Sequence, residues 1–434
     1  MILESIPFII LLSLVIIGPL FFASFWHKNY PKISIALALI VFLYFVQFKN
    51  DWESPVISLF EYFSFVIFLS ALFVISGGIY IHIDKNSTPK LNIIFLIIGS
   101  LTSNLIGTTG AAMLLIRPYI RFNKYHLKPF HIVFFIFTIC NLGGSLTPIG
   151  DPPLILGFFK GVPFFFTILN IAPYWLLAHV LLLGIFWILE FRNKTNLETQ
   201  TIEESNKIYL SGKRNIFWIL LIILSVFVNP STVSWVPYIQ IGHHHISFVR
   251  ELIQLLIIYL CYSFRDKNAY QLNEFSLAPL KEIVFLFIGI FITMVPVLNL
   301  LSTWSSKSGA DFINTSSLYW FSGIFSSLLD NAPTYLCFLT AAMSKSGLDI
   351  ASSKDVMLFA NGLQMNQLLA ISIGAVFFGA MTYIGNGPNF MVKSIAEEKD
   401  IKMPNFVKYI THYTIPYLLP VLIAVYLLLI YKYN

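Results

Sequence analysis

The stretch TPIGDPP at residues 147–153 follows a long apolar run, and a similar stretch, TYIGNGP, occupies residues 382–388. Thr, Ile, Gly, an Asp or Asn, and a final Pro hold the same places in both copies, 235 residues apart (147 to 382). Proline and glycine interrupt helices, because proline lacks the backbone N–H and keeps the residue before it out of the α conformation. Each stretch therefore predicts a break between two apolar helical segments.

The composition places these breaks inside a membrane. The chain has 434 residues, of which 57% are hydrophobic and only 11% are charged, whereas soluble domains carry about 25% charged residues. A broken helix at membrane depth is tolerated only where the freed backbone is buried in protein or lines a cavity. One such loop could arise by chance, but matched breaks in two halves of a chain are typical of the substrate site of a transporter.

The first half of the chain divides into segments of about 20 apolar residues, the length of a transmembrane helix. The stretch 91–120 differs, because SNLIGTTG interrupts two arms of about ten apolar residues, each too short to cross. It predicts a re-entrant hairpin. The expected spans of this half are 6–26, 32–48, 58–82, 130–159 (broken at 147–153) and 163–191.

The second half repeats this layout, with an interrupted hairpin at 314–343 in which Asn331 is expected to match Asn104 and Asp330 to match Ser103. The predicted fold is an all-α polytopic membrane protein of two inverted repeats, each with five transmembrane helices, one re-entrant hairpin and one discontinuous helix. The repeats would be residues 1–191 and 215–434, joined by a cytoplasmic linker at 192–214. The expected spans of this half are 215–229, 246–264, 282–303, 365–397 (broken at 382–388) and 405–431.

The charges predict the orientation of the chain. Most of its 27 Lys and Arg residues fall in loops on one side if neither hairpin crosses, and basic residues mark the cytoplasmic side. Both termini are then expected outside a bacterial cytoplasmic membrane. The basic residues form no stripe that would indicate a nucleic-acid partner. The sequence contains no nucleotide-binding loop or hydrolase motif, so neither an enzyme nor an ATP-driven pump is expected.

Two other groups of metal-binding residue types carry less information. The three cysteines all lie in apolar segments without metal-ligand spacing and are expected to be packing residues. The tract His243-His244-His245 lies in a predicted outer loop with no cysteine or carboxylate nearby. A solvated, weakly pH-sensing tract is therefore favoured over a metal site.

Four stretches, SNLIGTTGAAMLLIRP, NLGGSLTPIGDPPLILGFFKGVPFF, DNAPTYL and GAMTYIGNGP, resemble motifs of the ion transporter superfamily. That superfamily includes NhaD-type sodium/proton antiporters, arsenite permeases and citrate transporters. The resemblance covers nearly the whole chain and implies an inverted-repeat fold with a scaffold part and a mobile transport part, commonly in a homodimer. The Ser-Asn-Thr signature of dicarboxylate carriers is only partly kept, because Leu105 follows Ser103-Asn104 and the second copy has Ala332 after Asn331. This departure argues against a carboxylate substrate.

Two acidic residues lie inside these otherwise uncharged stretches, Asp151 at the first break and Asp330 at the tip of the second hairpin. A charge at that depth costs at least about 2.5–3.5 kcal/mol and indicates a functional group. Alternatively, Asp151 caps a helix and Asp330 is a turn residue. Oxygen ligands of this kind suit a hard cation such as Na⁺. The further residues expected to form the Na⁺/H⁺ site are Asn104, Asn331, Thr147, Thr382 and Asn386, with Ser103, Gly150 and Gly385 as further substrate-contacting positions.

The favoured hypothesis is a secondary antiporter that exchanges Na⁺ or Li⁺ for H⁺ by alternating access, because a proton and a cation compete for the same carboxylate oxygens. The hairpins and broken spans would move against the other helices, and no cofactor beyond the transported ions is expected. The alternatives are a Na⁺-coupled citrate or dicarboxylate transporter, an arsenite-type anion permease, a channel and a membrane scaffold.

Overall fold

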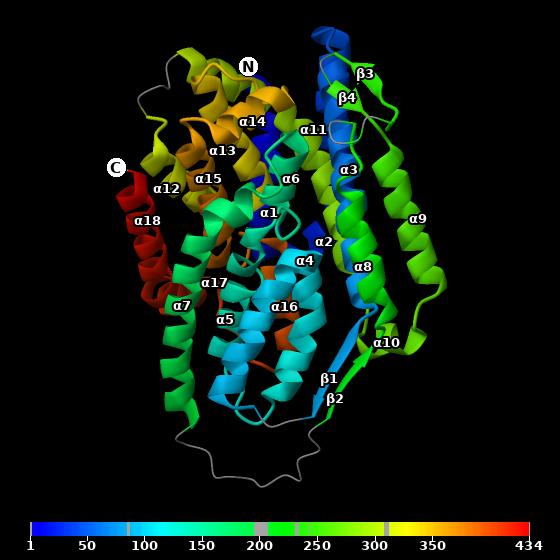
Figure 1. The fold of residues 1–434 in the computed structure, drawn as a ribbon. Coiled ribbons are helices and arrows are strands. Elements are labelled where there is room, and N and C mark those ends of the chain that lie inside the picture. The colour runs from blue at the N-terminus through cyan, green and yellow to red at the C-terminus, as the bar shows by residue number, and fades with distance from the viewer. Residues whose placement is uncertain are drawn as a thin grey trace.

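The computed structural model describes residues 2–84, 87–194, 207–230, 233, 235–242, 244–307 and 312–433. In these ranges the regular secondary structure is helical apart from two short antiparallel strand pairs (Figure 1). Seven of the helices described are long and apolar enough to cross a membrane, or eight if a strongly bent pair is counted as one span. The predicted all-α, multi-pass membrane fold is therefore confirmed.

The first two helices have other bounds than the predicted spans 6–26 and 32–48, because the helix that starts at Ile6 ends at Phe21 and the next one already starts at Ala23. The third span is shifted as well: its helix ends at Gly77 and the chain continues as a strand. The elements of this half are η1 Leu3–Ser5, α1 Ile6–Phe21, α2 Ala23–Phe48, α3 Glu53–Gly77, β1 Tyr80–Asp84, α4 Pro89–Phe122, α5 Pro129–Thr138, η2 Leu142–Leu146, α6 Pro152–Lys160 and α7 Phe166–Lys194.

In the second half, α8 and α9 are shorter than the predicted spans 215–229 and 246–264, whereas α11 extends beyond the predicted span 282–303 at both ends. Its elements are β2 Lys207–Ser211, α8 Arg214–Ser225, β3 Ile239–Ile241, β4 His244–Ile246, α9 Val249–Ser263, α10 Lys267–Leu272, α11 Ala278–Lys307, α12 Thr315–Leu328, α13 Asn331–Lys345, α14 Ser353–Asn361, α15 Met365–Phe377, η3 Phe378–Met381, α16 Gly387–Glu398, α17 Phe406–Tyr409, η4 Ile410–Leu418 and α18 Leu419–Tyr433.

Helix α4 folds back on itself at Gly107, whose φ of 76° and ψ of 156° are not helical. The Asn92 amide nitrogen near its start donates to Asn123 Oδ1 just past its end, 2.8 Å away and 31 residues along the chain. A straight helix of that length would separate the two residues by about 46 Å. The two arms of α4 therefore lie side by side as a helical hairpin (Figure 1).

Helices α12 and α13 form a second hairpin. The chain leaves helical geometry at Leu329 and Asp330, between the two helices. Lys345 Nζ at the end of α13 donates to Ile313 O, which precedes α12, at 2.5 Å. The two outer ends of this hairpin are therefore adjacent.

The first five residues of each signature stretch lie outside regular helix, 147–151 between η2 and α6 and 382–386 between η3 and α16, and the last two residues begin the following helix. Glycine is needed here because the backbone approaches itself closely. A Cβ on Gly150 would overlap the carbonyl oxygen of Gly144, and one on Gly385 would lie 2.7 Å from Gly379 O. The sequence thus permits a tight backbone crossing at each break.

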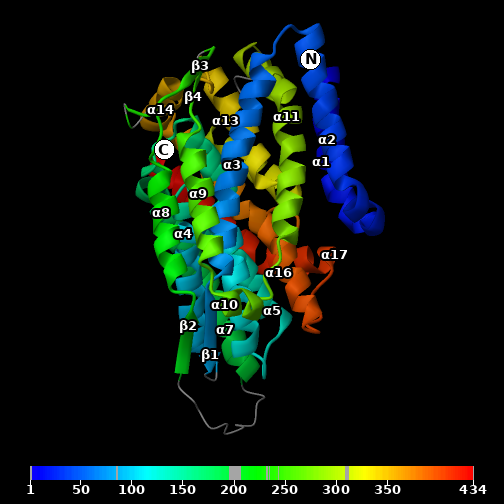
Figure 2. The same cartoon turned by 90° about the vertical axis from the view of Figure 1, so that its right-hand side faces the viewer.

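The broken segments lie at the centre of the molecule. Of the 18 residues from Pro129 to Leu146, 83% are buried within the protein, whereas 22% are buried in the apolar 18-residue window of the unbroken α2. The unbroken α3 packs against α8, α9 and α11, and these four helices form the side that lies on the right in Figure 1 and faces the viewer in Figure 2. The fold therefore buries the helix breaks and leaves the continuous helices outside.

Both ends of the predicted linker at 192–214 belong to helices or strands. Helix α7 continues to Lys194, residues 195–206 lie outside the described ranges, and β2 pairs antiparallel with β1 from Tyr80↔Ser211 to Asp84↔Lys207. The Ser211 hydroxyl donates to Asp266 at 2.8 Å, and this bond holds the pKa of the Asp266 carboxyl below its usual value. The start of the second half is thereby joined to the end of α3.

Candidate functional site

Asp151 lies between η2 and α6 and is 1% exposed. Its backbone is extended, and Pro152 begins α6 directly after it. In the described chain its carboxylate makes no capping hydrogen bond to α6. The interpretation of this side chain as a helix cap is therefore wrong, and its oxygens are available to other groups.

Three side chains from distant parts of the chain converge on this carboxylate. Thr108 Oγ1, one residue after the α4 hinge, donates to Oδ1 at 2.7 Å. Asn386 in the second break donates to the same oxygen at 3.0 Å, and Asn331 at the start of α13 donates to Oδ2 at 2.6 Å. All three donors are neutral. The site can thus hold a carboxylate without a fixed positive charge beside it.

The same region holds two amide oxygens that lack a hydrogen-bond partner within the described ranges. They belong to Asn331, whose nitrogen donates to Asp151, and to Asn141, whose nitrogen donates to Asn389 Oδ1 at 2.8 Å. Asn389 in turn donates to Thr382 O at 2.9 Å. Buried polar atoms are nearly always partnered, and carbonyl oxygens beside a carboxylate suit a hard cation.

Asn104 and Thr147 form a second group that supports the first break. Asn104 donates to Gly143 O at 2.6 Å and accepts from the Leu146 backbone N–H at 2.8 Å. The Thr147 hydroxyl donates to the backbone oxygen of Asn104 at 2.6 Å. Both side chains hold the α4 hairpin against η2, and neither makes a hydrogen bond to Asp151 in the described structure.

Thr382 supports the second break in the same way that Thr147 supports the first. Its hydroxyl donates to Ser327 O at 2.5 Å and accepts from the backbone N–H groups of Ile384 and Gly385, both at 3.1 Å. Ser103 donates to Ile139 O at 2.8 Å. These side chains are occupied by backbone groups, and Gly150 and Gly385 serve the close backbone crossings.

These contacts align the two hairpins differently from the sequence comparison. Thr147 bonds to Asn104 O as Thr382 bonds to Ser327 O, an offset of 223 residues (104 to 327). Ser103 and Ser326 donate to Ile139 and Ala375 with the same offset (103 to 326). The predicted matches of Asn104 with Asn331 and of Ser103 with Asp330 are therefore wrong by four residues.

The corrected alignment pairs Thr108 with Asn331 (108 to 331), and both donate to Asp151. Sequence reasoning missed Thr108, although it lies in the quoted stretch SNLIGTTG. Asn141 and Asn389 were also missed. Correct registration of the two hairpins would have identified Thr108, because its partner Asn331 was already a candidate.

Asp330 has a different environment. It is half-buried and precedes α13, where its Oδ1 accepts from the Ala332 backbone N–H at 3.0 Å. This is the geometry of an N-cap, which fits the alternative that Asp330 is a turn residue. The structure thus brings Asp151, Asn331 and Asn386 together, and it places Asp330 next to Asn331 in the chain without a hydrogen bond to Asp151 among the described contacts.

Residues 1–430 match a protein family described as "Putative citrate transport". A search of curated proteins returned no match. Among solved structures, the chain is similar to that of the Alcanivorax borkumensis YdaH transporter, described as having an unusual topology. The two share 14% sequence identity over 92% of this chain and 87% of the other, with a TM-score of 0.47.

Proposed function

The chain belongs to this citrate-transport family and is a multi-pass membrane transporter, and we propose that it exchanges Na⁺ or Li⁺ for H⁺ by alternating access. The observation that supports this proposal is the buried Asp151 carboxylate, whose donors are one hydroxyl and two amides. A buried carboxylate requires a compensating charge. A proton or a monovalent cation supplies it at the same oxygens, so that each displaces the other.

The oxygen set around Asp151 fits this exchange. Its Oδ1 accepts two hydrogen bonds, whereas Oδ2 accepts one, from Asn331. A carboxylate oxygen has two lone pairs, so Oδ2 retains one for a proton or a cation. Asn331 Oδ1, which has no hydrogen-bond partner among the described residues, belongs to the same amide, and a small rotation of that amide would give the cation a second ligand.

Alternating access follows from where the donors are anchored. Thr108 lies at the hinge of one hairpin, Asn331 begins the inner arm of the other, and Asn386 lies in the second break. Replacement of the Asp151 hydrogen bonds by cation contacts therefore acts on both hairpins and both breaks at once. We propose that these elements move together against the outer helices, in a bacterial cytoplasmic membrane with both termini outside and in a homodimer.

The test is a reconstituted-vesicle assay with the purified full chain. A Na⁺ gradient should change the internal pH, and Asp151→Asn should abolish the response while Asn268→Asp, an exposed change in α10, leaves it intact. If the parent protein moves no protons in response to Na⁺ or Li⁺, the proposal is wrong.

A second candidate is Na⁺-coupled uptake of citrate or a dicarboxylate, or an arsenite-type anion permease. The family description favours citrate. This function requires positive charge at the substrate site, which bound Na⁺ would have to supply, because the donors to Asp151 are neutral. Accumulation of labelled citrate, with little change in Asp151→Asn, would replace the exchange proposal.

A further inference from the structure

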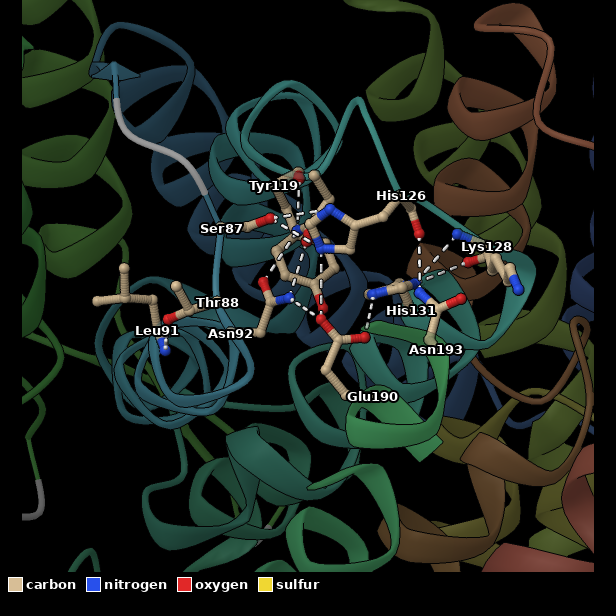
Figure 3. A network of polar contacts seen from close by, with 11 residues as sticks. Ser87, Thr88, Leu91, Asn92, Tyr119, His126, Lys128, His131, Glu190 and Asn193 are labelled. Carbon is tan, nitrogen blue, oxygen red and sulfur yellow. Dashed lines mark hydrogen bonds and ion pairs between the residues drawn. The ribbon is translucent and has the colours of Figure 1, made fainter. Parts of the chain in front are cut away.

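A second polar cluster lies at the ends of α4, α5 and α7, at the lower end of the molecule in Figure 1 and in close-up in Figure 3. It contains His126 in the connection between α4 and α5, His131 in the first turn of α5, and Glu190 near the end of α7. His131 is fully buried, Glu190 is 1% exposed, and the His126 side chain is 12% exposed. The cluster is thus enclosed by protein but reachable from the surface through His126.

The three side chains present a convergent set of ligand atoms. His131 Nε2 lies 2.8 Å from Glu190 Oε2, and His126 Nε2 lies 3.4 Å from Glu190 Oε1. One ligand atom from each residue can be chosen so that all three lie within 4.8 Å of one another. Ligands of a tetrahedral zinc ion, each about 2.0–2.1 Å from the metal, stand about 3.3 Å apart. Small side-chain rotations would bring the cluster to that geometry.

The Glu190 carboxylate also accepts a hydrogen bond from a side chain outside the cluster, as is typical of metal ligands. Asn92 Nδ2 donates to Glu190 Oε1 at 2.8 Å and to Asn123 Oδ1 at 2.8 Å, and Asn123 donates back to Asn92 Oδ1 at 2.9 Å. The reciprocal pair fixes which way both amides face. Glu190 is therefore oriented toward the two imidazoles before any metal binds.

His131 has a partner for either tautomer. Its Nδ1 lies 3.1 Å from the Lys128 backbone N–H donor and 3.2 Å from the Lys128 carbonyl oxygen. With a proton on Nε2, the imidazole donates to Glu190 and Nδ1 accepts from Lys128. With the proton on Nδ1, that nitrogen donates to Lys128 O and Nε2 is free to bind a metal. The backbone thus supports both the apo and the metal-bound form.

We propose that His126, His131 and Glu190 form a binding site for a first-row divalent cation, with Zn²⁺ as the probe. Two imidazoles and one carboxylate are a ligand set that zinc uses, with water or another oxygen in the fourth position. Ser87 Oγ lies 2.8 Å from His126 Nε2 and is a candidate for that position or its water. The bound ion would join the ends of α4, α5 and α7, and the site does not depend on which ion or molecule the protein transports.

The first experiment measures Zn²⁺ binding to the purified full chain in detergent by calorimetry. The tract His243-His244-His245 is replaced by glutamines in every sample, so that it cannot supply background binding. One zinc ion per chain is expected, with affinity lowered at least about 100-fold in His126→Gln and about 10–100-fold in Asn92→Leu, which alters a group behind the ligands. His412→Gln, an exposed histidine outside the cluster, is the matched control and should bind as the parent does.

A second measurement keeps the proposal testable if a ligand variant fails to fold. X-ray absorption is measured at the zinc edge on the chain that carries glutamines at 243–245 and no other change. The spectrum should show only nitrogen and oxygen ligands at about 2.0–2.1 Å, with imidazole scattering and no sulfur. Sulfur ligands would assign the metal to a cysteine instead. That result, an absence of bound zinc, or binding that persists in His126→Gln would overturn the proposal and leave the cluster as a structural polar contact only.

Discussion

Asp151 and Glu190 are both carboxylates with 1% exposure, but the protein compensates them in opposite ways. Asp151 accepts from a hydroxyl and two amides, whereas Glu190 accepts from one amide and lies beside two imidazoles, which can carry a positive charge when protonated. Asp151 lies at a helix break and Glu190 on the continuous α7. The difference indicates that the charge at Asp151 is left for a mobile ion, while the charge at Glu190 is held within the fold.

Replacement of each acid by its amide should give the largest difference in transport between the two sites. Asp151→Asn removes the charge that a transported cation needs, and Na⁺-driven proton movement in vesicles should fall to background. Glu190→Gln should leave the exchange rate, measured per folded protein in the presence of a chelator, within about threefold of the parent, a difference of under about 0.7 kcal/mol. Equal loss of transport in both variants would contradict the division of roles.

The backbone around the two acids also differs, and glycine substitutions can test this difference. The chain crosses itself closely just before Asp151, whereas Glu190 lies on a regular helix. Gly150→Ala puts a methyl group onto the Gly144 carbonyl oxygen, and the neighbouring backbone cannot move aside easily. We expect a loss of about 3 kcal/mol in the free energy of unfolding, together with loss of transport, measured by thermal denaturation in detergent and by the vesicle assay.

The matched control for this change lies on the helix of Glu190. An added Cβ on Gly184 in α7 meets nothing within 4 Å. Gly184→Ala should raise stability by about 0.5–1 kcal/mol, because alanine favours the helix. If Gly150→Ala were tolerated as well as Gly184→Ala, the close backbone crossing at the first break would not constrain the fold.

Much of this arrangement could be predicted from the sequence. Proline and glycine at 147–153 and 382–388 located both breaks, and the interruptions of two apolar runs located both hairpins, because these features depend on local backbone chemistry. The membrane class followed from composition alone. Inverted symmetry, membrane orientation and the dimer remain predictions.

The site was only partly predictable, because its partners are set by packing rather than by local sequence. Asp151, Asn331 and Asn386 were identified as polar residues in apolar surroundings, but Thr108 was not, since threonine is common in helices that cross membranes. The cluster of His126, His131 and Glu190 was missed for a related reason. Its members lie in three elements up to 64 residues apart (126 to 190), and no spacing pattern joins them.

For stability we expect the reverse order: Glu190→Gln should lower the free energy of unfolding more than Asp151→Asn does. Glu190→Gln leaves at least one buried donor facing it, the imidazole of His131 or the amide of Asn92, without its charged acceptor. We expect a loss of about 2 kcal/mol in unfolding free energy, seen as a lower thermal midpoint.

Asp151→Asn should cost under about 1 kcal/mol by the same measurement. Its new amide can keep the oxygen toward Thr108 and Asn386 and donate through its nitrogen to Asn331, whose own oxygen has no partner in the described structure. A larger loss in Asp151→Asn than in Glu190→Gln would mean that Asp151 is the structural member of the pair.

The smallest effect concerns one hydrogen bond at Asp151. Thr108→Val keeps the side-chain shape but removes the hydroxyl that donates to Oδ1, which should change the free energy of cation binding by about 0.8–1 kcal/mol. The Na⁺ concentration for half-maximal exchange should then shift about fourfold to fivefold. Thr109→Val, at the neighbouring half-buried position, should not shift it. Thr108 is the first-half counterpart of Asn331, so a shift in Thr108→Val alone would show that both hairpins contribute to one ion site. If the half-maximal Na⁺ concentration were the same in both variants, the site would be restricted to the breaks and the second hairpin.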